Sequence, residues 1–374
     1  MGPKRLTSLD GLRGIAALSV VVWHWQHFYA IGGVWQDGSK RAAEPFFAVL
    51  KPLYAQGWAA VDLFFVLSGF VFFWLYGEAI RTREAGGWRF ALLRFSRLYP
   101  LHFAMLVLVA ALQLSFLRLH GIYFIYQAND WPHFFASLFM VQNWWPNGPQ
   151  SFDGPAWSVS VEVLLYVLFF AACRAGLKAG VQSFILAIGA GALFWFDEHI
   201  ARGVIGFFMG GTMFACWQAL RGSAREALVA RVTGIASIVG WIVLAVMLYS
   251  NSPLLGRGET NTAFLAIFDY ALCPVTILAL ALRERVSGRS YKWLGFLGDI
   301  SYSTYMIHFP MQLALALIAT RLALTPDFFM RGSVMIAFYV VLIALGVASY
   351  RYFERPMQRL LRQRRSEPVI AVVD

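Results

Sequence analysis

Arg13 and His24 are the first residues of this chain whose types and spacing suggest chemistry. They lie eleven positions apart on one apolar segment. Eleven helical residues rise about 16 Å, close to half the thickness of a bilayer's hydrocarbon core. If the segment crosses a membrane, Arg13 lies at one face and His24 near mid-depth, where an ionisable group is costly and indicates a functional site. A histidine that only hydrogen-bonds a neighbouring helix fits the spacing equally well.

Three acidic residues stand near the starts of other apolar segments, namely Asp62, Glu162 and Asp269. Ser158 precedes Glu162 by four positions, so the two side chains share one helix face. Carboxylates are rare inside membranes and are functional candidates there. Hydrogen bonds between helices would account for Asp62 and Asp269 about as well as a functional role does.

Two later motifs add polar side chains at defined depths. His308 lies about half-way along a late apolar segment, at the depth expected for His24. Arg94 and Arg97 stand one helical turn apart just before the third apolar run, and guanidinium groups so placed can bind phosphate oxygens bidentately. Ordinary positive-inside anchoring would also explain two arginines at this edge.

The elements that hold these residues are expected to be membrane helices. The chain has 374 residues, of which 59% are hydrophobic and only 14% are charged, and its mean hydropathy is +0.60. The net charge of +11 does not indicate nucleic-acid binding, because the basic residues flank apolar runs. The three cysteines fall in apolar stretches, so we expect neither a disulfide framework nor a metal site.

Ten apolar runs are long enough to span a bilayer, and lipid requires each of them to be helical. The predicted fold class is an all-α integral membrane protein, a bundle of about ten transmembrane helices. With both termini cytoplasmic, most of the lysines and arginines fall on the inner side. The run 131–142 is too short and is predicted to be interfacial or re-entrant. The expected spans are 12–34, 57–77, 99–117, 157–174, 181–196, 203–220, 229–249, 263–282, 300–323 and 332–350.

Six ordered motifs give the chain a family resemblance. It resembles the membrane-bound acyltransferase family 3 of bacteria, which would occupy residues 1–356 and leave 357–374 as a basic cytoplasmic tail. Some members carry a fused esterase-like domain outside the membrane; we expect none here, because the chain ends soon after its last span. The motifs are Leu9-Asp-Gly-Leu-Arg-Gly with Arg13-x10-His24, Val61-Asp-Leu-Phe-Phe-Val-Leu-Ser-Gly-Phe, Arg94-x-x-Arg97-Leu-Tyr-Pro, Trp157-Ser-Val-Ser-Val-Glu162, Gly298-Asp-Ile-Ser-Tyr-Ser-x-Tyr-x-x-His308 and Tyr352-Phe-Glu-Arg-Pro356.

The resemblance implies acyl transfer, most often of acetyl, from cytoplasmic acyl-CoA to a hydroxyl of an extracytoplasmic glycan or glycolipid. We expect Arg94 and Arg97 to bind the CoA phosphates, with Arg13 as a further contact or gate. His24 would be the general base, with a transient acyl-histidine as the variant mechanism. Glu162 would orient His24 or relay its protons, and no metal is needed. The expected substrate-binding residues are Ser158, Asp62, His308 and Tyr302.

Two other classes of function remain open from the sequence. A proton-coupled transporter or flippase of a glycan or small molecule would use the buried histidines and glutamate as a proton relay. A non-catalytic membrane scaffold would tolerate the loss of His24. The pair Arg94 and Arg97 favours the enzyme, because a proton-coupled carrier has no need to bind CoA phosphates. The bacterial inner membrane is the expected location.

Overall fold

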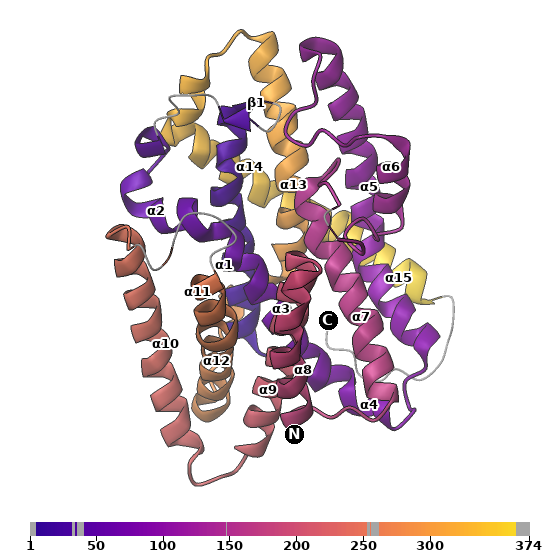
Figure 1. The fold of residues 1–374 in the computed structure, drawn as a ribbon, viewed down its shortest axis with the longest axis vertical. Helices are drawn as coiled ribbons and strands as arrows, with labels where there is room; N and C mark the ends of the chain where they lie inside the picture. Colours follow the sequence, from indigo (N-terminus) through magenta and orange to yellow (C-terminus); the bar gives the residue numbers. More distant parts are fainter. Residues whose placement is uncertain are drawn as a thin grey trace.

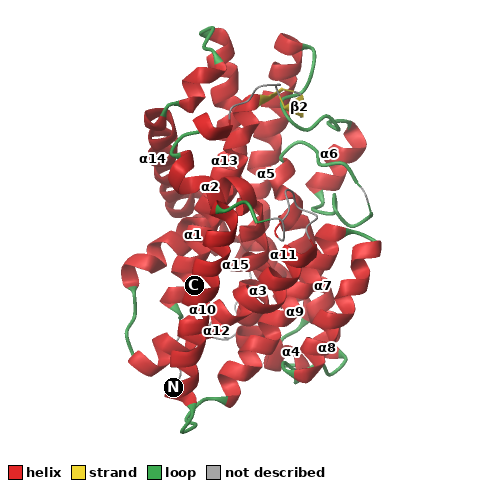
Figure 2. Ribbon diagram, turned by 60° about the vertical axis from the view of Figure 1, so that its left-hand side comes forward, coloured by secondary structure: helices red, strands yellow, loops and turns green. Residues whose placement is uncertain are grey.

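The computed structural model describes residues 5–31, 34–35, 41–146, 148–252, 255 and 262–363. Nearly all of these residues are helical (Figure 1 and Figure 2). Two strands of two residues each, β1 (Ala30–Ile31) and β2 (Val34–Trp35), pair antiparallel at one end of the molecule. Seven helical segments of the described chain are long and apolar enough to cross a membrane. The predicted class, an all-helical multi-pass membrane protein, is confirmed.

The seven candidate spans coincide with seven of the ten expected runs. The other three runs meet the requirements of a span less well. The first of them, expected over 12–34, is helical only as far as Tyr29 and then continues into β1. The helix of Val181–Trp195 is apolar but short, and the first and ninth runs carry many of the polar residues described below. The seven spans are Phe47–Arg81, Gly87–His120, Gly154–Arg174, Glu198–Ala219, Glu226–Tyr249, Ala263–Ser287 and Gly332–Arg362.

The helical elements follow one another with short connections, and several spans contain 3-10 or π-helical turns. Such turns shift the helix register and are frequent at functional sites. In chain order the elements are α1 (Thr7–His24), η1 (Trp25–Tyr29), η2 (Arg41–Ala43), α2 (Phe47–Gln56), η3 (Gly57–Ala59), α3 (Ala60–Phe72), η4 (Phe73–Gly77), α4 (Glu78–Arg81), α5 (Gly87–His120), α6 (Trp131–Leu138), η5 (Gly154–Ala156), α7 (Trp157–Arg174), α8 (Val181–Gly189), η6 (Ala190–Trp195), α9 (Glu198–Ala219), α10 (Glu226–Tyr249), α11 (Thr262–Ile267), η8 (Phe268–Leu272), α12 (Cys273–Ser287), α13 (Lys292–Arg321), η9 (Pro326–Met330), α14 (Gly332–Ser349), η10 (Tyr350–Glu354) and α15 (Arg355–Gln363).

Several helices begin earlier than the apolar runs that predict them, and two of these extensions bear on the site. α5 begins at Gly87, so Arg94 and Arg97 lie inside this helix and not before it. The first helix begins at Thr7, because a carboxylate from another helix completes its first turn: Glu284 accepts hydrogen bonds from the backbone N–H groups of Thr7 (3.0 Å) and Ser8 (2.8 Å). The first N–H groups of a helix have no partner within it, and an anion there is stabilised by the helix dipole.

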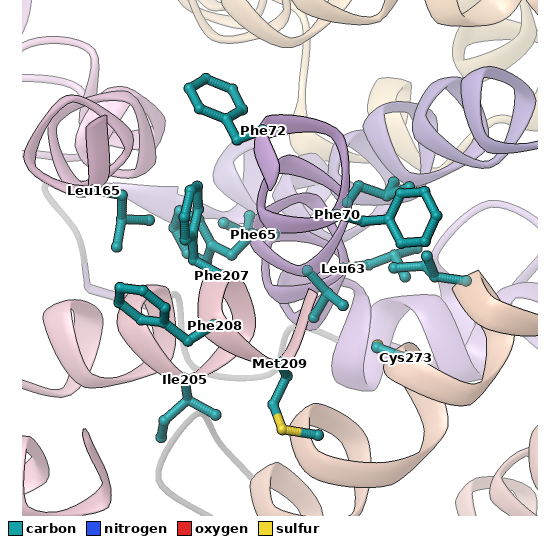
Figure 3. Close-up of a cluster of buried hydrophobic side chains, with 14 of the residues drawn as sticks. Leu63, Phe65, Phe70, Phe72, Leu165, Ile205, Phe207, Phe208, Met209 and Cys273 are labelled. Atoms are coloured by element: carbon teal, nitrogen blue, oxygen red, sulfur yellow. The ribbon is translucent and has the colours of Figure 1, made fainter. Parts of the chain in front are cut away.

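The largest apolar core lies between α3 and α9 (Figure 3). Glycines allow the two backbones to touch. A Cβ added at Gly69 would lie 1.8 Å from the carbonyl oxygen of Phe207, and one at Gly210 would lie 2.1 Å from that of Val66. Small residues at such crossings are the usual basis of tight helix packing in membranes. Phenylalanines surround the crossing, among them Phe65, Phe70, Phe72, Phe207 and Phe208.

A second close crossing joins α1 to α13, which lie side by side near the centre of the bundle. A Cβ added at Gly14 would lie 2.6 Å from the carbonyl oxygen of Leu297, and one at Gly298 would lie 2.7 Å from that of Asp10. The crossing fixes α1 and α13 against each other along their lengths. It therefore determines which residue of α13 faces His24.

The last described residues form a further helix on the bundle. α15 follows α14 through the π-helical turn η10 and packs against α5, where Nε of Arg362 donates to Oγ of Ser96 at 3.2 Å. Residues 357–363 of the expected tail belong to this helix. The remaining tail residues, 364–374, lie outside the described part of the chain.

Candidate active site

His24 ends α1 and lines a cavity of about 190 Å³, which we call the histidine cavity. His308 of α13 is fully buried beside it, with 3.0 Å between Nε2 of His308 and Nδ1 of His24. The two rings stack with centroids 4.9 Å apart. The structure thus brings together the two histidines that the sequence places at equal depth.

The hydrogen bonds around this pair assign its protons. Nδ1 of His308 is bonded to the backbone carbonyl oxygen of Tyr305, which can only accept, so this nitrogen carries the proton. In the neutral ring, Nε2 of His308 is then an acceptor, and the proton shared with His24 belongs to Nδ1 of His24. The same rule leaves Nε2 of His24 unprotonated. The pair is therefore arranged to present one basic imidazole nitrogen.

Gln312 holds the histidine cluster from the next turn of α13. It is fully buried. Its Nε2 donates to the carbonyl oxygen of His24 at 2.9 Å, and its Oε1 lies 3.1 Å from Nδ1 of His27. The His27 ring also lines the histidine cavity, 4.8 Å from the His24 ring. Gln312 is a positioning residue for both imidazoles.

A buried ion pair forms another wall of the histidine cavity. Arg202 of α9 lines the cavity and is 1% exposed, and Asp62 of α3 is 0% exposed. Nε and Nη2 of Arg202 lie 3.0 and 3.2 Å from the two carboxylate oxygens of Asp62. The guanidinium also lies over Trp58 at 4.4 Å and over Trp157 at 5.4 Å, and both indoles line the cavity. Asp62 thus fixes the position of Arg202, and Arg202 packs against the indole rings of Trp58 and Trp157.

A second cavity, of about 120 Å³, lies beside the first, and we call it the arginine cavity. Three predicted guanidinium groups line it from two helices: Arg13 of α1, and Arg94 and Arg97 of α5. Nη2 of Arg13 donates to Asp10 (3.3 Å) and to the carbonyl oxygen of Gly298 (3.2 Å). The arginines that the sequence assigns to one ligand therefore share one space.

Arg94 is held with part of its hydrogen-bonding capacity unused. Its Nη2 donates to the hydroxyl of Tyr76 at 2.6 Å, and its guanidinium lies 5.1 Å from the centre of the Phe72 ring. Tyr76 belongs to η4, a π-helical turn of the kind that often occurs at functional sites. Within the described structure, Nε of Arg94 and Nε of Arg13 are buried donors without a hydrogen-bond partner. Such donors favour an anion in the cavity.

Glu162 lines the arginine cavity together with these three residues. Its Oε1 accepts hydrogen bonds from Oγ of Ser68 (3.3 Å) and from the hydroxyl of Tyr166 (2.5 Å). The structure does not bring Glu162 to His24, because the two residues line different cavities. The partner that orients His24 is His308, which the sequence suggests only as a substrate-binding residue.

Two of the remaining predicted residues line the arginine cavity, and Asp62 contacts the histidine cavity through Arg202. Ser158 and Tyr302 both line the arginine cavity. Oγ of Ser158 lies 2.7 Å from the hydroxyl of Tyr305, and the hydroxyl of Tyr302 donates to the carbonyl oxygen of Leu98 at 2.7 Å. Among the described residues, no group of three or more His, Cys, Asp or Glu side chains is arranged to hold a metal ion.

Sequence reasoning missed four residues of the site: Arg202, His27, Gln312 and Tyr305. Arg202 stands near the start of an apolar run, as Asp62 does, and a search for opposite charges in the membrane would have paired them. Gln312 follows His308 by four positions and so shares its helix face. Tyr305 is part of the quoted motif that ends in His308, but the sequence gives it no separate signal.

An apolar helical bundle with two polar cavities inside it defines a multi-pass membrane protein with a buried site. A family model described as an acyltransferase domain, that of acyltransferase family 3, matches residues 6–351. The chain therefore belongs to this family, and it is an acyltransferase that folds as a bundle of membrane helices.

Curated relatives are similar to the chain along most of its length. Acyltransferase MdmB of Streptomyces mycarofaciens is 26% identical, over 99% of this chain and 95% of the relative. The peptidoglycan O-acetyltransferase OatA of Listeria monocytogenes is 22% identical over 95% of this chain, and the O-acetyltransferase OatA of Staphylococcus aureus is 23% identical over 96%. The match spans 56% and 58% of these two longer proteins. No solved structure matches the chain.

Proposed function

We propose that this protein transfers an acyl group, most simply acetyl, from cytoplasmic acyl-CoA to a hydroxyl of an extracytoplasmic glycan or glycolipid. One observation carries the proposal: a cavity with three arginines lies against a cavity with a basic imidazole, and the two share the wall residues Val61 and Tyr305. A donor with phosphates fits the arginine cavity, and a neutral acceptor fits the histidine cavity. The names of the OatA relatives, which state O-acetyl transfer, support the same reaction class.

The membrane arrangement that suits this reaction has about ten helices and both termini in the cytoplasm. We assign residues 1–356 to the catalytic bundle and 357–374 to a basic cytoplasmic segment, of which 357–363 belong to α15 and pack with it on α5. The positive-inside rule supports this arrangement, because arginines gather around α4 and the turn between α9 and α10. These two segments lie at the same end of the molecule, at the bottom of Figure 1. For a bacterial protein, this membrane is the inner membrane.

In the proposed donor complex, Arg13, Arg94 and Arg97 bind the CoA phosphates. The buried donors without partners on Arg13 and Arg94 support this role, since each would gain a charge-assisted hydrogen bond. Ser158 and Tyr302 contact the donor in the same cavity. Glu162 balances part of the positive charge, so that CoA can also leave.

In the proposed reaction, Nε2 of His24 takes the proton from the acceptor hydroxyl. The acceptor oxygen attacks the thioester carbonyl, the carbon–sulfur bond breaks, and the proton passes from His24 to the sulfur of CoA. His308 stabilises the imidazolium of His24 through the shared Nδ1 proton. An acyl-histidine would divide the same transfer into two steps. Asp62 acts through Arg202 on the wall that receives the acceptor.

Thiol release from acetyl-CoA by the purified protein in detergent tests the proposal. An enzyme releases CoA and forms acylated glycan without a membrane gradient, whereas a proton-coupled transporter requires sealed vesicles. Mass spectrometry of surface glycans from cells with and without the gene identifies the acceptor. Folded protein that neither binds nor cleaves acetyl-CoA, and cells whose glycans are unchanged by deletion, would exclude this function.

A further inference from the structure

The histidine cavity and the arginine cavity meet at only a thin boundary within the described structure. Of the residues that line them, Val61 of α3 and Tyr305 of α13 line both. Tyr305 is 7% exposed and Val61 is 4% exposed. These two side chains therefore stand between the space that holds the arginines and the space that holds His24.

Tyr305 is fixed in this boundary by its hydroxyl. The hydroxyl donates to the carbonyl oxygen of Pro155 at 2.6 Å and lies 2.7 Å from Oγ of Ser158. Both partners belong to the start of the helical segment Gly154–Arg174, so the hydroxyl ties α13 to α7 across the boundary. The Tyr305 ring lies 6.1 Å from that of Phe64, which lines the arginine cavity.

The same residue also touches the histidine pair. Its backbone carbonyl oxygen accepts the Nδ1 proton of His308, and its ring lies 5.6 Å from the His308 ring. The Tyr305 backbone therefore contributes the hydrogen bond that fixes the proton position on His308 and, through it, on His24. The side chain borders both cavities, and the backbone orients the base.

We propose that Tyr305 is a gate between the two cavities, which closes the path between the acyl donor and the acceptor until both are bound. The proposal rests on the proposed function for its role in acyl transfer, but the closed boundary is a property of the fold alone. Tyr305 is a positioning residue in this scheme. Its ring separates the thioester from water in the histidine cavity, and its hydroxyl anchors hold the ring in place.

An open gate would allow a wasteful reaction. Water in the histidine cavity would lose a proton to His24 and attack the thioester carbonyl through its oxygen. The carbon–sulfur bond would break, the proton would pass to the sulfur, and the products would be acetate and CoA. Exclusion of water from a reactive acyl group is a recognised role of closed active sites.

A labelling experiment tests the boundary without any catalysis. Ser68→Cys places a thiol in the arginine cavity, and a membrane-impermeant maleimide is added to the outer face of spheroplasts. The parent chain, with its three native cysteines, sets the background. We expect no labelling above background when Tyr305 is present and clear labelling of the Tyr305→Ala protein. The Tyr305→Phe protein should be labelled more slowly than Tyr305→Ala, because phenylalanine keeps the ring but loses both hydroxyl contacts. In inverted vesicles all these proteins should be labelled.

Acetate release from acetyl-CoA without an acceptor gives the catalytic readout. We expect Tyr305→Ala to hydrolyse acetyl-CoA about tenfold faster than the parent, as loss of a barrier of about 1.4 kcal/mol would produce. Tyr54→Phe is the matched control. Tyr54 is also a buried tyrosine whose hydroxyl donates to a proline carbonyl oxygen, that of Pro45 at 3.0 Å, but it lines neither cavity.

The outcomes separate the gate from the reaction. The gate would be overturned if Ser68→Cys is labelled from the outer face to the same extent with tyrosine, phenylalanine or alanine at position 305. It would also be overturned if none of these three proteins is labelled. Tyr305→Phe carries the test if the alanine variant has a lowered melting temperature. Gated labelling with no cleavage of acetyl-CoA by any variant would support the closed boundary and reject the proposed donor.

Discussion

The histidine cavity and the arginine cavity hold their titratable side chains in different ways. In the histidine cavity, Nδ1 of His24 and Nδ1 of His27 are committed to internal partners, His308 and Gln312. In the arginine cavity, Arg94 keeps a buried donor without a partner in the described structure. An internal chain of hydrogen bonds fixes a tautomer before any ligand arrives. Unused guanidinium donors instead provide binding energy that only a ligand can release, because an unsatisfied buried donor costs about 1–3 kcal/mol.

This difference suggests that chemistry and affinity are divided between the cavities. Changes in the histidine cavity should lower the rate of transfer at constant donor affinity. Loss of an arginine from the arginine cavity should lower donor affinity. A variant that changes both properties together would show that the cavities are not separate in function.

The largest effect is expected for His24. His24→Ala should lower acyl transfer by roughly 10²–10⁴-fold, the typical contribution of a general base, while CoA affinity stays within twofold of the parent, about 0.4 kcal/mol. Radiolabelled transfer and calorimetric CoA binding on one preparation measure both. His24→Gln should do no better, since an amide nitrogen cannot accept the proton. His120, which is bonded to Thr320 outside both cavities, provides the control His120→Ala. Full transfer by folded His24→Ala would remove this histidine from the mechanism.

Asp62 should affect stability more than chemistry. Asp62→Asn removes the carboxylate bonded to Nε and Nη2 of the buried Arg202 and leaves Glu198, whose Oε1 lies 3.5 Å from Nη1. Loss of one partner of a buried ion pair typically costs about 3–5 kcal/mol. We expect a clearly lowered melting temperature in detergent. Asp62→Leu combined with Arg202→Met removes both charges and should recover much of that loss. Unchanged thermal stability of Asp62→Asn would contradict a stabilising role for the Asp62–Arg202 pair and leave the substrate-binding role that the sequence predicts for Asp62.

The arginine pair should determine donor affinity. Arg94→Ala and Arg97→Ala should each weaken CoA binding by roughly 1.5–3 kcal/mol, the range for a hydrogen bond to a charged group. Arg94→Lys should recover only part, because lysine lacks the planar fork. Calorimetry with CoA and with dephospho-CoA identifies which phosphate is bound. Arg118, exposed near the other end of the same helix, supplies the control Arg118→Ala. Parent-like CoA affinity in both cavity variants would place the phosphates elsewhere.

Glu162 should give the smallest effect of the four. Glu162→Gln removes an anion from among the arginines, so CoA should bind at least as tightly as to the parent. Transfer should fall on the order of tenfold, about 1.4 kcal/mol, because the bonds from Ser68 and Tyr166 to a charged acceptor are weakened. Glu162→Asp should recover part of the rate. A loss of transfer as large as that of His24→Ala would indicate that Glu162 does exchange protons with His24.

Local pattern was enough to predict much of the architecture. The apolar runs predict the helices because a segment in lipid must satisfy its own backbone, and seven of them have the length and hydropathy of spans. The spacing from Arg13 to His24 separates two levels of one helix, and those residues do line different cavities. Arg94 and Arg97, three positions apart on α5, line one cavity for the same local reason.

Which helix faces meet could not be read from local pattern. The sequence favours Glu162 as the partner of His24 and gives His308 only a substrate-binding role, although both are polar residues in apolar helices. The choice depends on the crossing of α1 with α13, where Gly14 and Gly298 let the backbones touch. That contact joins residues almost three hundred positions apart, and helical periodicity carries no information about it.

By itself, then, the sequence determined a membrane bundle, its family motifs and the residue types that could react, because hydropathy and spacing act along the chain. The tertiary structure alone decided that His308 orients His24, that Asp62 pairs with Arg202, and that Tyr305 stands between the cavities. The physical reason is close packing. Glycine contacts bring the helix backbones together at a defined register, and that register selects each partner.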